Sequence, residues 1–420
     1  MRLLVVSPHF PPVNAPDMQR ARLALPYLAA AGDEVTVLTV DDPTPLAPVE
    51  PELLSTIPPA VGLVRTRCLS RRWTRLLGLN NVALRALPFL FLSGCRLLRG
   101  RRYDVVYFST TMFIVLPFGR IWRRWYGVPY VIDLQDPWVT DFYQAPGAPR
   151  PPGGWKYRVA RMLAAAMEGW TMRRVSHLIT VSRDYAAALR NRYAELQALP
   201  FTELPFGAPD PDLRHLRRTL HERPPILPRG GFRLAFAGAL GPGMLGCVEV
   251  LFAALGRLRQ EGHALRVHFY GTSYAEDGGS VTASLAARHG IGDLVHEAPR
   301  RLKYFEALQV QLEADANLLF GSTDLAFTPS KVLPLLAAGR PIVAIAHADS
   351  ALSRRLSELG QPCALVNDSA GHAVTATRDR LKGLLDAANP AVPAVPPALS
   401  AEAVARTQRE ILAAAAGSLS

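Results

Sequence analysis

Short apolar runs alternate with longer amphipathic stretches through the first half of the chain. The amphipathic stretches repeat their apolar positions with helical spacing and lie at residues 18–31, 118–126 and 155–174. The apolar runs read as buried strands at residues 2–7, 34–40, 104–109, 130–134 and 177–182. Strands that alternate with helices predict a parallel α/β sheet with right-handed crossovers, in which ligands collect at the carboxyl ends of the strands.

A proline-rich break at residues 206–228 precedes a second α/β series. Its predicted strands are residues 232–237, 265–270, 316–320 and 341–345, with a helix at 248–260. A further proline-rich stretch at 389–399 leads to a closing helix at 401–416. We therefore expect two doubly wound domains at residues 1–205 and 229–390, a linker at 206–228, and a segment at 391–420 that packs back on the first domain.

Composition argues against a zinc-binding, disulfide-rich, secreted or membrane-spanning protein, but it does not identify a function. The chain has 420 residues and a net charge of +12, and its four cysteines are too dispersed to suggest a zinc site or a disulfide framework. A reducing cytoplasm is the simplest location for such a chain. The apolar run before Pro8 is too short for a signal peptide, and Arg85, Pro88 and Arg96 interrupt the most apolar stretch, residues 82–98.

The positive charge is concentrated in residues 65–102, which contain ten arginines and no acidic residue. Because apolar side chains such as Trp73 and Phe89 are interspersed, the segment resembles a helix lying on an anionic membrane surface. A buried helix flanked by solvated arginines fits the same pattern. Nucleic acid ranks last as a partner, since no nucleic-acid-binding motif accompanies the charge.

The stretch TPSKVLPLLAAGRPIVAI at residues 328–345 predicts a loop, a short helix, a glycine stop and a buried strand. Pro329 keeps the preceding backbone extended, so the helix should begin near Ser330 and end at Gly339. Backbone N–H groups and the helix dipole would then converge at Ser330, where a phosphate is favoured. Lys331 adds a charge there and is one of only four lysines in the chain. A surface lysine in a helix cap is the alternative.

Taken together, several motifs resemble the GT-B glycosyltransferases, and among them the retaining family 4 enzymes. The motifs lie at residues 3–12, 32–39, 128–138 and 236–241, and at 329–331 with 336–341. The resemblance implies two Rossmann-like domains facing across a cleft, the first on the acceptor side and the second binding a nucleoside-diphosphate sugar, without metal or cofactor. It implies a glycan or lipid-linked acceptor, for example one of the cell envelope. The dispersed cysteines and the basic segment at residues 65–102 predict a cytoplasmic enzyme that is peripheral to the inner membrane face. The implied donor residues are Ser330, Lys331, Val332 and Gly241 for the diphosphate, with Gly238 and Pro334 beside them.

The chain departs from the family pattern in three places. The two positions that usually carry glutamates hold Ala326 and Pro334. No cation follows the Gly238 turn, so Lys331 is expected to carry the leaving-group charge nearly alone. The glycine-rich loop after the first strand is replaced, and the acceptor-side candidates there are Asn14, Asp17 and Arg20.

Asp136 follows a predicted strand and is the candidate catalytic residue, able to bind a sugar hydroxyl or accept the acceptor's proton. A turn or helix-cap role is its alternative. Asp210 and Asp212 have the spacing of a metal site but lie in the predicted linker, and His9 is interpreted as structural. Two rival hypotheses remain open, a non-catalytic GT-B binding or scaffold protein and a nucleotide-sugar epimerase.

Overall fold

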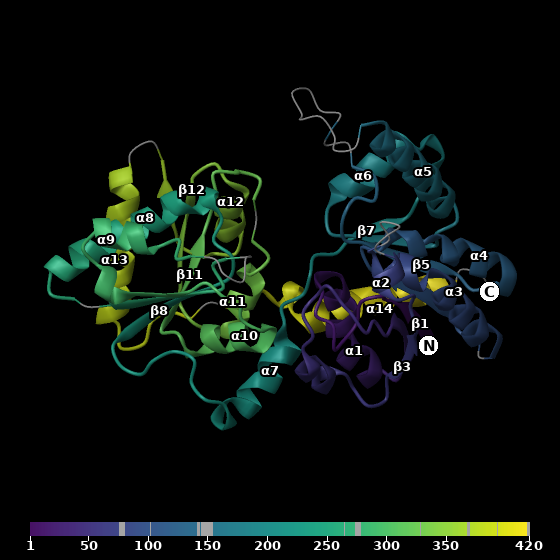
Figure 1. Ribbon diagram of the computed structural model, residues 1–420, viewed down its shortest axis with the longest axis horizontal. Coiled ribbons are helices and arrows are strands. Elements are labelled where there is room, and N and C mark those ends of the chain that lie inside the picture. Colours follow the sequence, from purple (N-terminus) through teal and green to yellow (C-terminus); the bar gives the residue numbers. More distant parts are fainter. Residues whose placement is uncertain are drawn as a thin grey trace. The chain divides into compact units, whose positions relative to one another are not determined.

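A computed structural model describes residues 1–74, 80–100, 102–140, 143, 154–263, 265–273, 279–327, 329–367, 370–392 and 394–417. The chain divides into two compact units (Figure 1). Unit 1 comprises Met1–Gly207 and Ala401–Ser420, and unit 2 comprises Ala208–Ser400. The sequence predicts one α/β sheet in each half, and this fold class is confirmed.

Unit 1 contains a seven-stranded, fully parallel sheet in the order β3-β2-β1-β4-β5-β6-β7. Its strands are β1 (Arg2–Val6), β2 (Glu34–Val40), β3 (Gly62–Thr66), β4 (Val105–Ser109), β5 (Tyr130–Leu134), β6 (His177–Thr180) and β7 (Phe201–Glu203). Successive strands are added from β1 towards β3 and then, on the other side of β1, from β4 towards β7. The order of strand addition therefore reverses between β1 and β4, and a crevice for ligands is expected at such a point.

The helices of unit 1 cover both faces of this sheet. They are α1 (Gln19–Ala30), α2 (Arg71–Thr74), α3 (Val82–Gly100), α4 (Pro117–Tyr126), α5 (Trp155–Met172), α6 (Arg183–Arg192) and α14 (Ala401–Gly417). Although α14 comes last in the chain, Figure 1 shows it in yellow among the purple and blue elements of unit 1, and it packs on α1.

The basic, apolar segment at residues 65–102 contains a helix that faces the core. Helix α3 buries Val82, Ala86, Leu90 and Leu98 in the main core cluster of unit 1. Its Arg85 is also buried and forms an ion pair with Asp42. This placement fits the buried-helix alternative over the described part of the segment. None of the described helices is long and apolar enough to cross a bilayer.

Unit 2 contains a six-stranded, fully parallel sheet in the order β10-β9-β8-β11-β12-β13. Its strands are β8 (Phe232–Ala237), β9 (Leu265–Tyr270), β10 (Val295–Ala298), β11 (Ala316–Phe320), β12 (Ile342–His347) and β13 (Cys363–Val366). The four strands that the apolar runs predict are all present within two residues of their expected ends.

Two apolar clusters place the helices of unit 2 on opposite faces of its sheet. One cluster joins the sheet to α8 and α13, and the other joins it to α11 and α12 (Figure 1). The helices are α7 (Asp210–Thr219), α8 (Leu245–Gln260), α9 (Ala283–Arg288), α10 (Tyr304–Glu313), α11 (Val332–Ala338), α12 (Ala351–Glu358) and α13 (Ala370–Asp386). Helix α7 lies within the segment that the sequence predicts as a linker.

Helix α11 begins later than the sequence predicts. Lys331 is its N-cap residue and Val332 its first helical residue, so Ser330 lies ahead of the helix. Thr328 is outside the described residues. The predicted stop is confirmed, because Gly339 adopts a left-handed conformation with φ of 67°.

Candidate functional site

A cavity of about 530 Å³ opens at the carboxyl ends of the central strands of unit 2. Its walls come from the turn after β8, from Gly271 after β9, from Arg301 after β10 and from the loop before α11. Gly238, Gly241, Ser330 and Lys331 all line it. The structure thus brings together four of the six residues that the sequence predicts for the donor side, from segments about 90 residues apart.

The side chain of Lys331 inserts into the turn that follows β8. Its Nζ donates a hydrogen bond to the carbonyl oxygen of Ala237 at 3.0 Å and lies 3.9 Å from the ring centroid of Phe236. Gly238 adopts φ of 143°, and a Cβ added there would lie 2.2 Å from the Lys331 Nζ. The glycine therefore leaves the space that the ammonium group occupies.

Burial, and then the charge of Arg301, lower the pKa of Lys331 to about 7. One carbonyl and one aromatic face only partly replace the hydration of an ammonium group. An anion in the cavity would favour the charged form and would raise the pKa of Lys331 again.

Arg301 is a cavity residue that the sequence interpretation missed. It follows strand β10 and lines the same cavity as Lys331. Arg301 thus places a second cationic residue on the walls of this cavity, beside the Lys331 that the sequence predicts to carry the leaving-group charge nearly alone. Strand β10 is a short, polar edge strand, and without it in the prediction nothing places Arg301 at the carboxyl edge of the sheet.

The remaining donor-side candidates contribute less to this cavity. The N–H of Val332 donates to the carbonyl oxygen of Pro329 at 3.4 Å, so it already has a backbone acceptor. Pro334 is the third residue of α11 and is not among the described residues that line the cavity. Ala326, at the first missing glutamate position, is exposed, and its N–H donates to Asp324 Oδ1 at 3.0 Å.

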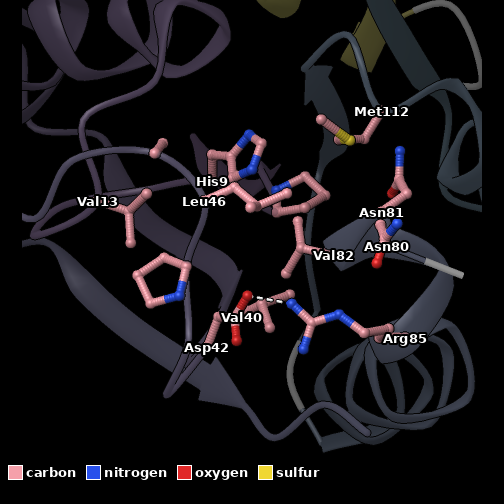
Figure 2. A pocket seen from close by; sticks show the side chains of 13 residues that line it. His9, Val13, Val40, Asp42, Leu46, Asn80, Asn81, Val82, Arg85 and Met112 are labelled. Carbon is pink, nitrogen blue, oxygen red and sulfur yellow. Dashed lines mark hydrogen bonds and ion pairs between the residues drawn. The ribbon is translucent and has the colours of Figure 1, made fainter. Parts of the chain in front are cut away.

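A second cavity, of about 270 Å³, lies at the carboxyl ends of β1 and β2 in unit 1 (Figure 2). Its walls are mainly apolar and include Val13, Val40, Leu46 and Met112. The Asp42–Arg85 ion pair and the ring of His9 provide polar groups on its walls, as Figure 2 shows.

His9 is held in this cavity by Asp17. The His9 Nδ1 lies 3.1 Å from Asp17 Oδ1, while Asp17 Oδ2 accepts hydrogen bonds from Thr110 Oγ1 at 2.8 Å and from the N–H of Thr111 at 3.3 Å. Burial alone would raise the pKa of Asp17, but His9 and the two threonine donors hold it below its usual value. An ionised carboxylate on Nδ1 leaves the other ring nitrogen, Nε2, available as a proton acceptor.

The acceptor-side candidates from the sequence lie behind this cavity or apart from it. The guanidinium of Arg20 is buried, donates to the carbonyl oxygens of Leu204 at 2.8 Å and Pro205 at 3.0 Å, and pairs with Asp133. Asn14 donates to Glu50 Oε1 at 2.9 Å. Of the described residues that line the unit 1 cavity, none is Asn14, Asp17 or Arg20.

The candidate catalytic residue Asp136 lies in the turn after β5 and is exposed. It is absent from the described linings of both cavities. Asp212, whose spacing from Asp210 resembles a metal site, is buried in α7 and accepts a hydrogen bond from the Tyr304 hydroxyl at 2.6 Å.

Residues 19–207 match the sequence model of a family described as "Glycosyl transferase 4-like domain". Across nearly its whole length the chain also resembles solved structures. Anabaena HepE in complex with UDP has 13% identity and a TM-score of 0.54, covering 99% of this chain and 100% of its own. HepE with UDP-glucose has 14% identity and a TM-score of 0.51, covering 100% and 99%. UDP-GlcNAc 2-epimerase from Methanocaldococcus jannaschii has 11% identity and a TM-score of 0.52, covering 98% and 99%.

These similarities define the class of protein: the fold is GT-B, with one parallel α/β sheet in each unit. More specifically, residues 19–207 match the glycosyl transferase 4-like family model, which confirms the resemblance found in the sequence. No curated protein sequence matches the chain significantly. At these identities the structural neighbours show the fold alone, and an epimerase shares it.

Proposed function

We propose that the protein is a glycosyltransferase that binds a nucleoside-diphosphate sugar in the cavity of unit 2, with the diphosphate against Lys331 and Arg301. The observation that carries the proposal is the Lys331 ammonium, inserted beside Gly238 at the carboxyl end of β8. The glycosyl transferase 4-like domain and the UDP and UDP-glucose complexes of HepE support a nucleotide-sugar donor.

In this proposal the cavity stabilises the leaving diphosphate as the glycosidic bond breaks. Lys331 and Arg301 supply positive charge, and Ser330 adds a hydroxyl donor on the exposed side. Gly241 lets the phosphate approach the backbone closely, because it presents no side chain. Transfer is metal-independent and retaining, as the family resemblance implies. With Ala326 and Pro334 in place of carboxylates, transfer is slow and donor hydrolysis without acceptor is barely detectable.

The acceptor binds in unit 1. The mainly apolar cavity beside His9 suits the apolar part of a glycan or lipid-linked acceptor, and the Asp17-bound imidazole is placed to accept a proton from a hydroxyl group there. Asp136 stays a second candidate for this role. A lipid-linked acceptor of the cell envelope is compatible with a cytoplasmic protein that is peripheral to the inner membrane face.

The test is calorimetric titration of UDP-, GDP- and ADP-sugars into the wild type and into Lys331→Ala. We expect Lys331→Ala to weaken donor binding by about 1.5–3 kcal/mol, the range for a charge-assisted hydrogen bond, and Ser330→Ala to weaken it less. Lys382→Ala, which removes a half-exposed lysine paired with Asp386 on α13, is the matched control. Unchanged affinity in folded Lys331→Ala protein would refute the donor site.

Product analysis with the tightest donor separates the remaining hypotheses. A transferase releases nucleoside diphosphate and joins the sugar to an acceptor. An epimerase changes the configuration of the sugar, and a binding or scaffold protein retains the donor unchanged. Donor binding without any turnover across an acceptor library would therefore favour the non-catalytic alternative.

A further inference from the structure

Helix α5 presents an apolar stripe to solvent instead of to the core. Trp155, Met162 and Leu163 are 66%, 68% and 61% exposed. The full stripe consists of Trp155, Val159, Met162, Leu163, Ala166 and Trp170. At about 100° of rotation per residue these positions fall within an arc of roughly 100°, which is the width of a face that amphipathic helices normally bury. An exposed apolar stripe of this size marks an interaction surface.

A basic groove adjoins the end of this stripe. It is formed by α4 and by the last turn of α5 with the residues after it, and Arg120, Arg123, Arg124 and Arg174 line it beside Trp125 and Trp170. The guanidinium of Arg120 lies 4.4 Å from the ring centroid of Trp170 and donates to its backbone carbonyl, which couples the two helices. We call the stripe and the groove together the α4–α5 surface.

The α4–α5 surface has almost no acidic residues to balance its arginines. Helix α4 contains none, and the single one in α5, Glu168, is buried and bound to Arg192 at 2.7 Å. Trp125, at the rim of the groove, is 58% exposed. Basic side chains next to exposed tryptophans and aliphatic residues are the composition of helices that lie in the interface of an anionic bilayer.

We propose that the α4–α5 surface docks the protein on an anionic lipid bilayer. Helix α5 lies in the plane of the interface, with Trp155, Met162 and Leu163 in the acyl boundary. The arginines of the groove meet lipid phosphates, and Trp125 and Trp170 lie at headgroup level. This inference is independent of the donor site and assigns the membrane contact to residues other than 65–102.

Charge and apolar character together select this partner over the alternatives. Two copies of the surface would bring like charges together, which disfavours self-association. A nucleic acid would satisfy the arginines but would leave the Met162 and Leu163 side chains in water. An anionic bilayer satisfies both parts of the surface at once.

The experiment is sedimentation with vesicles of phosphatidylcholine containing about 30% phosphatidylglycerol. We expect wild-type binding to fall at least tenfold when salt rises from about 0.1 to 0.5 M, and to be negligible on pure phosphatidylcholine. Met162→Asp with Leu163→Asp, and separately Arg124→Glu with Arg174→Glu, should each weaken binding at least tenfold. These side chains are exposed, so circular dichroism should show that both variants fold.

Two control variants make the same charge change elsewhere. Arg218→Glu with Arg406→Glu alters exposed positions on α7 and α14 and should leave binding unchanged. Arg96→Glu with Arg99→Glu on α3 should also bind like the wild type. The proposal is overturned if the wild type ignores anionic vesicles, if either α4–α5 variant binds normally, or if only the α3 variant loses binding. Loss through the arginine changes alone, with the Met162 and Leu163 variant binding normally, would indicate a purely electrostatic contact with headgroups and would refute the insertion of α5.

Discussion

At the scale of single residues, Lys331 and Gly238 depend on each other, because the lysine ammonium occupies the space that a side chain at 238 would fill. The lysine needs a turn without a side chain, and the turn needs a residue that tolerates φ of 143°. Among the residues that the structure describes, a carbonyl and an aromatic ring contact the ammonium group, and burial together with Arg301 lowers the pKa of Lys331 to about 7. Its protonation is therefore tied to the arrival of an anion.

Donor binding should take up a proton above neutral pH. In the free protein Lys331 is charged below about pH 7 and loses its charge as pH rises, whereas a bound diphosphate would keep it charged. The affinity for UDP-glucose should thus be flat below pH 7 and fall up to about tenfold per pH unit above it. Calorimetry at pH 8.5 in buffers of different ionisation enthalpy should report uptake of up to one proton. Lys331→Arg should abolish the uptake, and uptake that persists in this variant would contradict the assignment.

Gly238→Ala should disturb both the turn and the lysine. A methyl group 2.2 Å from the Lys331 Nζ displaces the ammonium group, and φ of 143° strains any residue with a Cβ by about 1–3 kcal/mol. We expect lower stability in denaturant titrations and donor affinity reduced as much as in Lys331→Ala. Gly246→Ala is the control, because its Cβ meets nothing within 4 Å and its φ is not positive. Equal effects at the two glycines would refute this account.

At the scale of elements, α11 is a short helix whose start tolerates an unusual residue. Pro334 is its third residue, within the first turn, where a missing N–H costs no intrahelical hydrogen bond. The helix forms because Val332, Leu335 and Leu336 pack against the sheet. Packing therefore holds the helix in place without the carboxylate that the family usually has at this position.

Pro334→Glu tests whether the donor site is a weakened version of the family's. The substitution restores a carboxylate where the family resemblance expects the nucleotide ribose. Donor affinity should rise by about 1 kcal/mol, the range for one well-made hydrogen bond. Pro334→Ala, which restores the N–H alone, is the matched control. No difference between the two variants in calorimetry would mean that the nucleotide lies elsewhere.

At the scale of the whole molecule, helix α14 packs on unit 1 although the residues of unit 2, Ala208–Ser400, separate them in the sequence. Asp33 accepts from the amine of Met1 at 2.9 Å and from Arg409 of α14 at 2.7 Å, so β1 and α14 are both tied to one carboxylate. Helix α14 buries Val404, Ile411 and Leu412 on this unit. Helix α14 thus belongs to the core of unit 1.

Removing residues 401–420 should destabilise unit 1 selectively. The loss of several buried aliphatic side chains costs about 3 kcal/mol or more. Calorimetric scans should then show an earlier transition for unit 1, while nucleotide still raises the transition of unit 2. Leu412→Ala should shift the same transition by a smaller amount, and Glu402→Ala, at an exposed position of α14, should not. An unchanged scan after truncation would contradict the role assigned to α14.

The central strands of both sheets could be predicted from the sequence because they are buried on both faces. Strands such as β4 and β5 are apolar along almost their whole length, and every residue is buried. The strands that the pattern missed are β3, β7, β10 and β13, which are the two edges of each sheet. Edge strands are short and half-exposed, so they carry no continuous apolar run.

The sequence by itself determined the class of fold, and it predicted donor-side candidates that lie next to each other in the chain. Only the tertiary structure decided which distant residues share a site. Arg301 joined Lys331 because an edge strand delivers it to the same end of the sheet, and His9 became a cavity residue because Asp17 holds its ring. Tertiary packing likewise turned α3 inward and left the stripe of α5 exposed. An amphipathic pattern specifies an apolar face, whereas the neighbours available in the fold decide whether protein or solvent covers it.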